Sequence, residues 1–179
     1  MKHWMSYITA HPLYNSSKKV VLLRGNPHNP HLLLVGESPG KTENRVGTPF
    51  VGSAGKLLDM WLSSSGITDF AITNVVPLMP LDKEGKIRKP SKSEIEYFKP
   101  LLFFMIKHIK PQYIILLGST ASEAVLGMKI SQSVFKVFER EIEGKMYRIG
   151  VVYHPAYYLR RGQSGAEDFE NVYREVINE

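Results

Sequence analysis

The segment from Gly36 to Asp59 reads GESPGKTENRVGTPFVGSAGKLLD. It follows a short apolar run, HLLLV at 31–35, which is typical of a buried parallel strand. Its second half, 53–64, has apolar residues at helical spacing: Ala54, Leu57, Leu58, Trp61 and Leu62. A strand, a glycine-rich turn and a helix in this order predict the first unit of a parallel sheet.

The same alternation continues along the chain. We expect further strands at 70–76 and 113–117, and a hairpin within 134–152 that ends in a strand at 147–152. Helices are expected at 91–108, 121–126 and 166–177, and an exposed loop at 78–92. These elements predict a three-layer α/β/α sandwich around a short, mostly parallel central sheet, in a single domain spanning 1–179.

Composition narrows the class of protein. The chain has 179 residues, 43% hydrophobic and 22% charged, as in one globular domain. It has no cysteine, which excludes disulfides, thiolate metal ligands and a cysteine nucleophile. The net charge of +6 is compatible with a polyanionic partner such as DNA, and equally with a merely basic surface. With no long apolar run or signal peptide, we expect a cytoplasmic protein without a membrane partner.

Three polar segments follow predicted strands: GESPG at 36–40, Asn74, and His154. Ligands of parallel sheets bind beyond the carboxyl ends of the strands, so these segments predict one pocket. Each also has a simpler reading, because a GxxPG segment is commonly only a turn, an Asn often caps a turn, and a His is often a packed residue.

Longer motifs carry a resemblance to a known family. The stretch 36–59 is similar to the first motif of family four uracil-DNA glycosylases, GE(A/G)PG followed by GxPFVGxAGxLL. ITNVV at 72–76, ILLGSTA at 115–121 and YHPAYYLRR at 153–161 resemble its later motifs, in the same order. The resemblance implies a uracil-DNA glycosylase-like fold and an enzyme that flips uracil out of DNA and hydrolyses its glycosidic bond, leaving an abasic site for base excision repair. We expect a monofunctional enzyme because the predicted pocket contains no proposed amine nucleophile, although Lys41 near the motif is the open alternative.

The resemblance also implies three catalytic residues. Cleavage leaves negative charge on uracil, which His154 and the backbone amides around Glu37 and Ser38 would face. Asn74 would read the Watson–Crick edge with its amide donor and acceptor. Glu37 would position water or stabilise the cationic sugar, although a carboxylate in a turn without any chemistry is the alternative.

Further substrate-binding residues follow from the same resemblance. Phe50 would stack on the flipped base. Glu43 would sit near C5 of uracil, where a side chain can block the methyl group of thymine. Ser38 stands where the family usually has Ala or Gly, and its hydroxyl could contact the base. Outside the motif, Phe50 would pass for a core residue and Glu43 for a solvated charge.

The segment after His154 is the predicted DNA interface. Leu159 is the first candidate for an apolar wedge in the base stack and Tyr158 the second, beside the phosphate-binding candidates Arg160 and Arg161. The alternative for this segment is a helix start that packs Tyr157 into the core. A second basic group in the 78–92 loop is either a set of phosphate contacts or a solvated surface: Lys83, Lys86, Arg88, Lys89 and Lys92.

One departure from the family concerns its cofactor. Family four enzymes hold a four-iron four-sulfur cluster on four cysteines, and the matching positions here are Ile8, His11, Leu78 and Phe98. We therefore expect no cluster and no other metal. The cluster ties the N-terminal segment to the middle loop in the family, and apolar packing of Ile8, Leu78 and Phe98 is expected to replace that tie.

Two other functions remain open from the sequence. One is a glycosylase of the same fold that excises another deaminated or modified base, which Ser38 motivates. The other is a non-catalytic member that binds DNA or a protein partner. A covalent histidine trap, as in one related branch, is not expected because 83–93 contains no histidine. We expect a monomer that is nucleoid-associated when it is bound to DNA.

Overall fold

The computed structural model describes residues 2–178, in which six strands form one sheet of order β1-β3-β2-β4-β6-β5. The four central strands are parallel: β2 (Leu32–Gly36), β3 (Phe70–Asn74), β4 (Tyr113–Leu117) and β6 (Lys145–Val152). The two edge strands, β1 (Arg24–Gly25) and β5 (Val137–Ile142), are antiparallel. The predicted, mostly parallel sheet is confirmed, together with the hairpin that forms β5 and β6.

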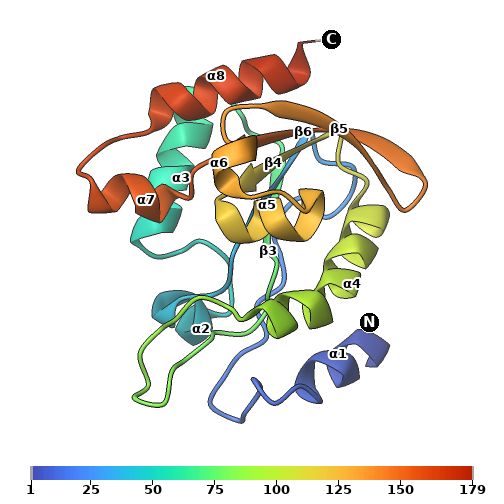
Figure 1. The fold of residues 1–179 in the computed structure, drawn as a ribbon, viewed down its shortest axis with the longest axis vertical. Coiled ribbons are helices and arrows are strands. Elements are labelled where there is room, and N and C mark those ends of the chain that lie inside the picture. Colours follow the sequence, from blue (N-terminus) through green and yellow to red (C-terminus); the bar gives the residue numbers. More distant parts are fainter. Residues whose placement is uncertain (1, 179) are drawn as a thin grey trace.

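Both faces of the sheet are covered by helices because side chains of a strand alternate between its faces. In β2, Leu33 and Val35 point into one apolar core, whereas Leu32 and Leu34 point into the other. The first core lies under α1 (Lys2–Thr9), α4 (Lys92–Ile109) and α5 (Ser119–Leu126), and the second under α3 (Ser53–Ser64) and α8 (Ala166–Ile177). Figure 1 shows these helix layers on either side of the strands, which confirms the predicted sandwich.

Helix α4 begins where the sequence predicts. Ser91 Oγ accepts the Glu94 N–H at 3.2 Å, and the Glu94 carboxylate accepts the Ser91 N–H at 2.8 Å, which forms a capping box. One edge strand, β1, and four short helices were not predicted: α1, α2 (Lys41–Val46), α6 (Ile130–Ser133) and α7 (Pro155–Arg160). The strand predicted at 70–76 ends at Asn74. Its last residue therefore lies at the carboxyl edge of the sheet.

The order of the strands opens a crevice at this edge. The chain leaves β2 toward α3 on one face of the sheet, and it leaves β4 toward α5 on the opposite face. Connections that depart in opposite directions from neighbouring parallel strands leave a gap between them, and this is where ligands bind in such sheets. The residues after β2 and β4 are thus placed to form a site.

The N-terminal segment is tied to the middle of the chain by apolar contacts. Ile8, Leu78 and Phe98 are each fully buried in the same core. The ring of His11 lies 5.1 Å from the ring of Phe98, and its Nδ1 accepts the Leu13 N–H at 2.9 Å. Three of the four positions that carry cluster ligands in the family are thus buried in one core and the fourth, His11, contacts Phe98; they hold packed apolar side chains and one engaged imidazole. These residues do not fit an iron–sulfur cluster.

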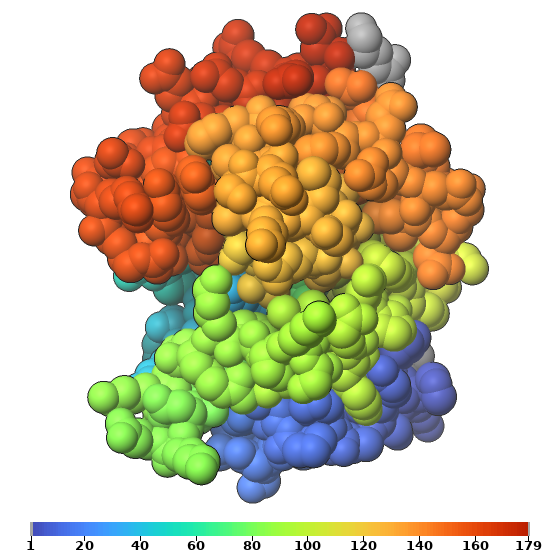
Figure 2. Space-filling model, viewed as in Figure 1, coloured from blue at the N-terminus to red at the C-terminus, as the bar shows by residue number. Residues whose placement is uncertain are grey.

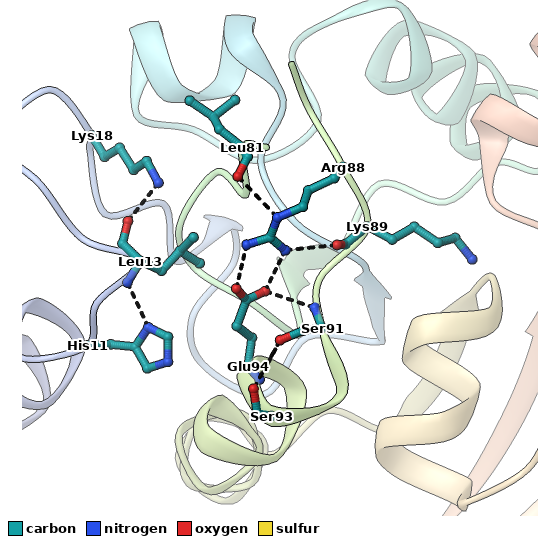
Figure 3. Close-up of polar contacts among 9 residues, drawn as sticks. All are labelled: His11, Leu13, Lys18, Leu81, Arg88, Lys89, Ser91, Ser93 and Glu94. Carbon is teal, nitrogen blue, oxygen red and sulfur yellow. Dashed lines mark hydrogen bonds and ion pairs between the residues drawn. The ribbon is translucent and has the colours of Figure 1, made fainter. Parts of the chain in front are cut away.

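A polar cluster beside this contact fastens the 78–92 segment to α4 (Figure 3). Arg88 donates to both carboxylate oxygens of Glu94, at 2.6 and 3.0 Å, and its Nε donates to the Leu81 carbonyl at 3.1 Å. Lys18, which is 8% exposed, donates to the Leu13 carbonyl at 2.6 Å. The segment predicted as an exposed loop is thus anchored at Arg88, and it forms a hairpin with a bridge between Leu81 and Ile87. The predicted exposure is wrong at the start of the segment, because Leu78 and Met79 are buried in the core.

Candidate active site

A pocket of about 240 Å³ lies at the carboxyl edge of the sheet, and we call it the first pocket. Figure 2 shows the recess that leads to it, between the red region of α7 and the green hairpin of 81–89. Its lining includes all six residues predicted to meet the substrate: Glu37, Ser38, Glu43, Phe50, Asn74 and His154. The structure therefore brings together residues from four separate segments of the chain.

The floor of the first pocket depends on the absence of a side chain at Gly36. A Cβ atom there would lie 2.5 Å from the Phe50 ring and 2.6 Å from Asn74 Oδ1, closer than packed atoms allow. Phe50 itself has a positive φ of 56°, and its carbonyl accepts a hydrogen bond from Arg24 at 2.7 Å. This strained backbone is therefore held from outside and presents the ring to the pocket.

Asn74 offers an unsatisfied amide to the first pocket. The residue is only 6% exposed, and its Oδ1 has no hydrogen-bond partner among the described residues. A buried polar atom without a partner costs about 1–3 kcal/mol, a cost that a ligand with a matching N–H would remove. The side-chain amide can donate as well as accept, so it suits a ring edge that carries an N–H next to a carbonyl.

His154 is a neutral donor at the wall of the first pocket. It caps α7, and its Nδ1 accepts the Ala156 N–H at 3.0 Å, which leaves Nε2 to carry the proton. Burial lowers the pKa of His154 to about 4, with a further contribution from the positive charges of Arg160 and Lys89. Its ring lies 5.5 Å from that of Phe50. The pocket thus combines an aromatic surface with an uncharged N–H donor.

Glu37 is oriented across the crevice between β2 and β4. Thr120 Oγ1 donates to Glu37 Oε2 at 2.5 Å. Thr120 is 4% exposed and lies in the first turn of α5, while Glu37 directly follows β2. A residue of α5, the helix that follows the neighbouring strand β4, therefore holds one oxygen of the Glu37 carboxylate. Thr120 was not predicted from the sequence. Its place three residues after the end of a strand, in the quoted ILLGSTA motif, is a usable signal.

Glu43 holds the rim of the first pocket through its carboxylate. One oxygen accepts the Gly40 N–H at 3.1 Å, and the other accepts the N–H groups of Val51 and Gly52 at 2.9 and 2.6 Å. Glu43 thus joins the two turns that flank α2. The position of Glu43 near C5 of a bound base stays a prediction. The hydrogen bonds from these three backbone amides already hold the carboxylate that would make this contact.

A second pocket of about 480 Å³ adjoins the first. Four residues line both pockets: Glu37, Ile87, His154 and Ala156. Lys89, whose Nζ donates to Ser119 Oγ at 3.0 Å, and Arg160 add positive charge to its wall. Ile87 at the shared boundary was not predicted. The sequence signal for it is an apolar residue between Lys86 and Arg88 in a highly charged segment. In the structure its side chain is 45% exposed.

The predicted DNA interface needs one correction at Tyr158. Its side chain is 2% exposed, its ring packs edge-on against Trp61 at 5.5 Å, and its hydroxyl donates to Asp168 at 2.7 Å. Tyr158 therefore belongs to the core, because α7 turns that residue inward, and the prediction that it contacts DNA is wrong. Leu159 is 43% exposed on the same helix. Its role as a wedge stays a prediction.

The two arginines after Leu159 lie at the surface. Arg160 lines the second pocket, and the guanidinium of Arg161 lies 3.8 Å from the ring centre of Tyr157. Tyr157, for which core packing was the alternative, is half-buried and lines the second pocket. In the other basic group, Arg88 is occupied by Glu94 and is not available to a phosphate.

The fold and the site define a class of protein: an α/β protein with a pocket for one planar, hydrogen-bonding ring at the carboxyl edge of its sheet. Comparison with known proteins makes this specific. The family model of the uracil DNA glycosylase superfamily matches residues 23–177, so the chain belongs to that superfamily.

Three curated relatives are each named type-4 uracil-DNA glycosylase. The relative from Archaeoglobus fulgidus is 35% identical over 81% of this chain and 74% of its own. The one from Pyrobaculum aerophilum is 36% identical over 73% of this chain and 68% of its own. The one from Thermotoga maritima is 38% identical over 85% of this chain and 78% of its own. The family resemblance drawn from the motifs is thus confirmed.

Proposed function

We propose that this chain is a uracil-DNA glycosylase that hydrolyses the bond between uracil and deoxyribose in DNA. The observation that carries the proposal is the unpartnered amide of Asn74 beside the neutral His154 and the ring of Phe50 in one pocket. Uracil is planar and presents an N–H between two carbonyls. Asn74 accepts a hydrogen bond from N3–H of uracil and donates one to O4 of uracil. His154 donates a hydrogen bond to O2 of uracil.

The reaction breaks the bond between C1′ and N1, and the electron pair leaves with uracil. His154 Nε2–H stabilises the resulting anion, and its lowered pKa keeps the ring uncharged before the reaction. Glu37, held by Thr120, faces the sugar, which carries positive charge in the transition state. Water adds to C1′ and yields an abasic site. The proton that this water loses passes to Glu37 or to solvent, and the uracil anion finally takes a proton from solvent.

We further propose that this activity needs no iron–sulfur cluster or other metal. The chain has no cysteine, and the four matching positions are filled by packed side chains. Among residues 2–178, no three His, Asp or Glu side chains lie close enough to hold a metal ion.

No helix in the same range is both long and apolar enough to cross a membrane. We propose a cytoplasmic, monomeric enzyme whose macromolecular partner is uracil-containing DNA.

The test is an excision assay without added metal. Labelled oligonucleotides carry one uracil opposite guanine, opposite adenine, or unpaired, and alkali reveals abasic sites. We expect strand cleavage only at uracil, with less than one iron atom per protein molecule by metal analysis. Binding of these oligonucleotides without any cleavage would favour the non-catalytic alternative.

Ser38 supports a second candidate, excision of another deaminated base. Its side chain lines the first pocket beside Asn74, where the family usually has Ala or Gly. A hydroxyl can donate or accept, so it can match a ring edge that differs from uracil. Oligonucleotides with hypoxanthine, xanthine or 5-substituted uracil test this alternative, and a Ser38→Ala variant shows whether the hydroxyl selects among them.

A further inference from the structure

The second pocket continues the first along the path that a DNA strand must take. The two pockets share Glu37, Ile87, His154 and Ala156, so a nucleotide whose base fills the first pocket has its sugar at this boundary. The next part of the strand then meets the second pocket, whose wall carries Lys89 and Arg160. This charge suits a polyanion.

A column of aromatic rings begins in the second pocket, where Tyr153 and Tyr157 are lining residues, and extends beyond it. Tyr153, after β6, stacks on Tyr157 of α7 with ring centres 4.0 Å apart and planes 12° apart. Arg161 covers the outer face of Tyr157 at 3.8 Å. At the other end, the ring of Phe135 meets Tyr153 nearly perpendicularly at 5.5 Å. Three separate segments of the chain therefore build one continuous column.

Phe135 is the exposed end of this column. It is 42% exposed, and it has a positive φ of 63°, which is unfavourable for a bulky residue. Its N–H donates to the Val151 carbonyl at 2.8 Å, so the backbone is fixed in this conformation. The molecule thus holds a phenyl ring at its surface, beside a charged pocket, in a conformation that glycine would adopt more easily.

We propose that the second pocket and Phe135 bind an unpaired nucleotide that neighbours the uracil, with its base stacked on Phe135. Aromatic side chains next to positive charge are how proteins bind single-stranded DNA without reading its sequence. The proposal rests on the proposed function and specifies its substrate: uracil in single-stranded or locally opened DNA. A base that remains paired and stacked between its neighbours in a duplex has no free face for the Phe135 ring.

The test combines a protein change with a substrate change. Single-turnover excision is measured on two single-stranded oligonucleotides, one with ordinary bases around uracil and one whose neighbouring positions carry abasic tetrahydrofuran. Phe135→Ala is expected to lose about tenfold in kcat/KM on the first oligonucleotide, in line with the loss of one stacked base. The same substitution should cost almost nothing on the second, because the stacking base is already missing.

Met146→Ala is the matched control, since Met146 is also an exposed apolar residue (59%) but lies at the opposite end of β6. It should stay within about twofold of the wild type on both oligonucleotides. An equal loss for Phe135→Ala on both substrates, or no loss on either, would overturn the proposal. If the wild type excises nothing, the proposed function fails separately. Fluorescence anisotropy with a uracil-free single strand then decides the binding site, with about tenfold weaker binding expected for Phe135→Ala.

Discussion

At the scale of single residues, hydrogen bonds from neighbouring residues orient two of the three proposed catalytic groups of the first pocket, His154 and Glu37. The Ala156 N–H occupies Nδ1 of His154, and Thr120 occupies one oxygen of Glu37. Asn74 Oδ1 is the exception, because it has no partner among the described residues. His154 and Glu37 are thus oriented before substrate binds, whereas Asn74 Oδ1 receives its hydrogen bond only from a bound base.

The state of His154 gives the first prediction. Its pKa is lowered to about 4, so the ring should remain neutral throughout the neutral range and gain a proton only as the pH falls through about 4. Long-range nitrogen–proton NMR spectra of labelled protein should show the Nε2–H tautomer and an inflection near that pH. An inflection of His154 near 6.5 would contradict the neutral-donor account.

Thr120 gives the second prediction. Replacing it with Val keeps the shape of the side chain but removes the hydrogen bond to Glu37, so we expect kcat to fall about 10- to 100-fold, with KM and melting temperature nearly unchanged. Thr120→Ser keeps the hydroxyl and should restore most of kcat. A fall in stability that parallels the fall in rate, or no rescue by Ser, would show that Thr120 is only a packing residue.

At the scale of elements, the first turn of α4 fixes one wall of the site. Glu94 caps its own helix and also accepts both hydrogen bonds from Arg88. The hairpin is thereby held so that Ile87 and Lys89, on either side of Arg88, line the second pocket. A helix cap thus positions residues of the site. Its hydrogen bonds to Arg88 keep the pKa of Glu94 below the ordinary value of 4.5, despite burial.

The third prediction concerns this ion pair. Glu94→Gln leaves Arg88 without its charge partner and should lower the free energy of unfolding by about 2 kcal/mol, less than a fully buried pair because Arg88 is partly exposed. A carboxylate with a lowered pKa stabilises the fold above its unfolded pKa, and this contribution is lost as the pH falls through the lower folded pKa. Urea unfolding should therefore show a smaller difference between variant and wild type in acid.

Glu170→Gln is the control for that experiment. It removes one member of a solvent-exposed pair with Arg174 on α8 and should change the free energy of unfolding by less than about 0.5 kcal/mol. Equal effects of the Glu94 and Glu170 substitutions, or a Glu94 effect that does not diminish in acid, would refute the assigned role of the buried pair.

At the scale of the whole molecule, apolar packing joins the N-terminal helix to the central loop and α4. Ile8, Leu78 and Phe98 are fully buried together, although they are distant in sequence. Aromatic contacts between α1 and α4 extend this junction, since Tyr7 stacks on Tyr97 at 4.3 Å. Apolar and aromatic packing, with reciprocal hydrogen bonds between the Tyr7 and Tyr97 hydroxyls and carbonyls, thus joins these segments, and no metal ligand set occurs among the described residues.

The fourth prediction tests this junction. Leu78→Ser should lower the free energy of unfolding by about 3 kcal/mol or more, because it leaves a cavity and buries a hydroxyl. Met60→Ser, at an exposed position of α3 (44%), should change it by less than about 0.5 kcal/mol. A Leu78→Ser variant as stable as the wild type in thermal and urea unfolding would contradict the hypothesis that apolar packing holds the two segments together.

Much of this architecture could be predicted from the sequence, since β2 and β4 are apolar runs and α3 and α8 show helical periodicity. Helices α2 and α7 have only six residues each, too few for a period to appear. The adjacent Tyr157 and Tyr158 are indistinguishable in sequence, because distant contacts with Trp61 and Asp168 decide which one is buried. Motifs located the pocket residues, whereas the Thr120–Glu37 bond joins residues 83 positions apart and needed the fold.

The central claim is that this pocket removes uracil from DNA and that Asn74 recognises the base. The most direct measurement compares the wild type with Asn74→Ala for single-turnover excision of uracil, and for affinity toward the same DNA. We expect the excision rate to fall on the order of 100-fold or more, while DNA affinity changes by less than about threefold. Excision retained by the variant, or a wild type that excises no uracil, would contradict the account.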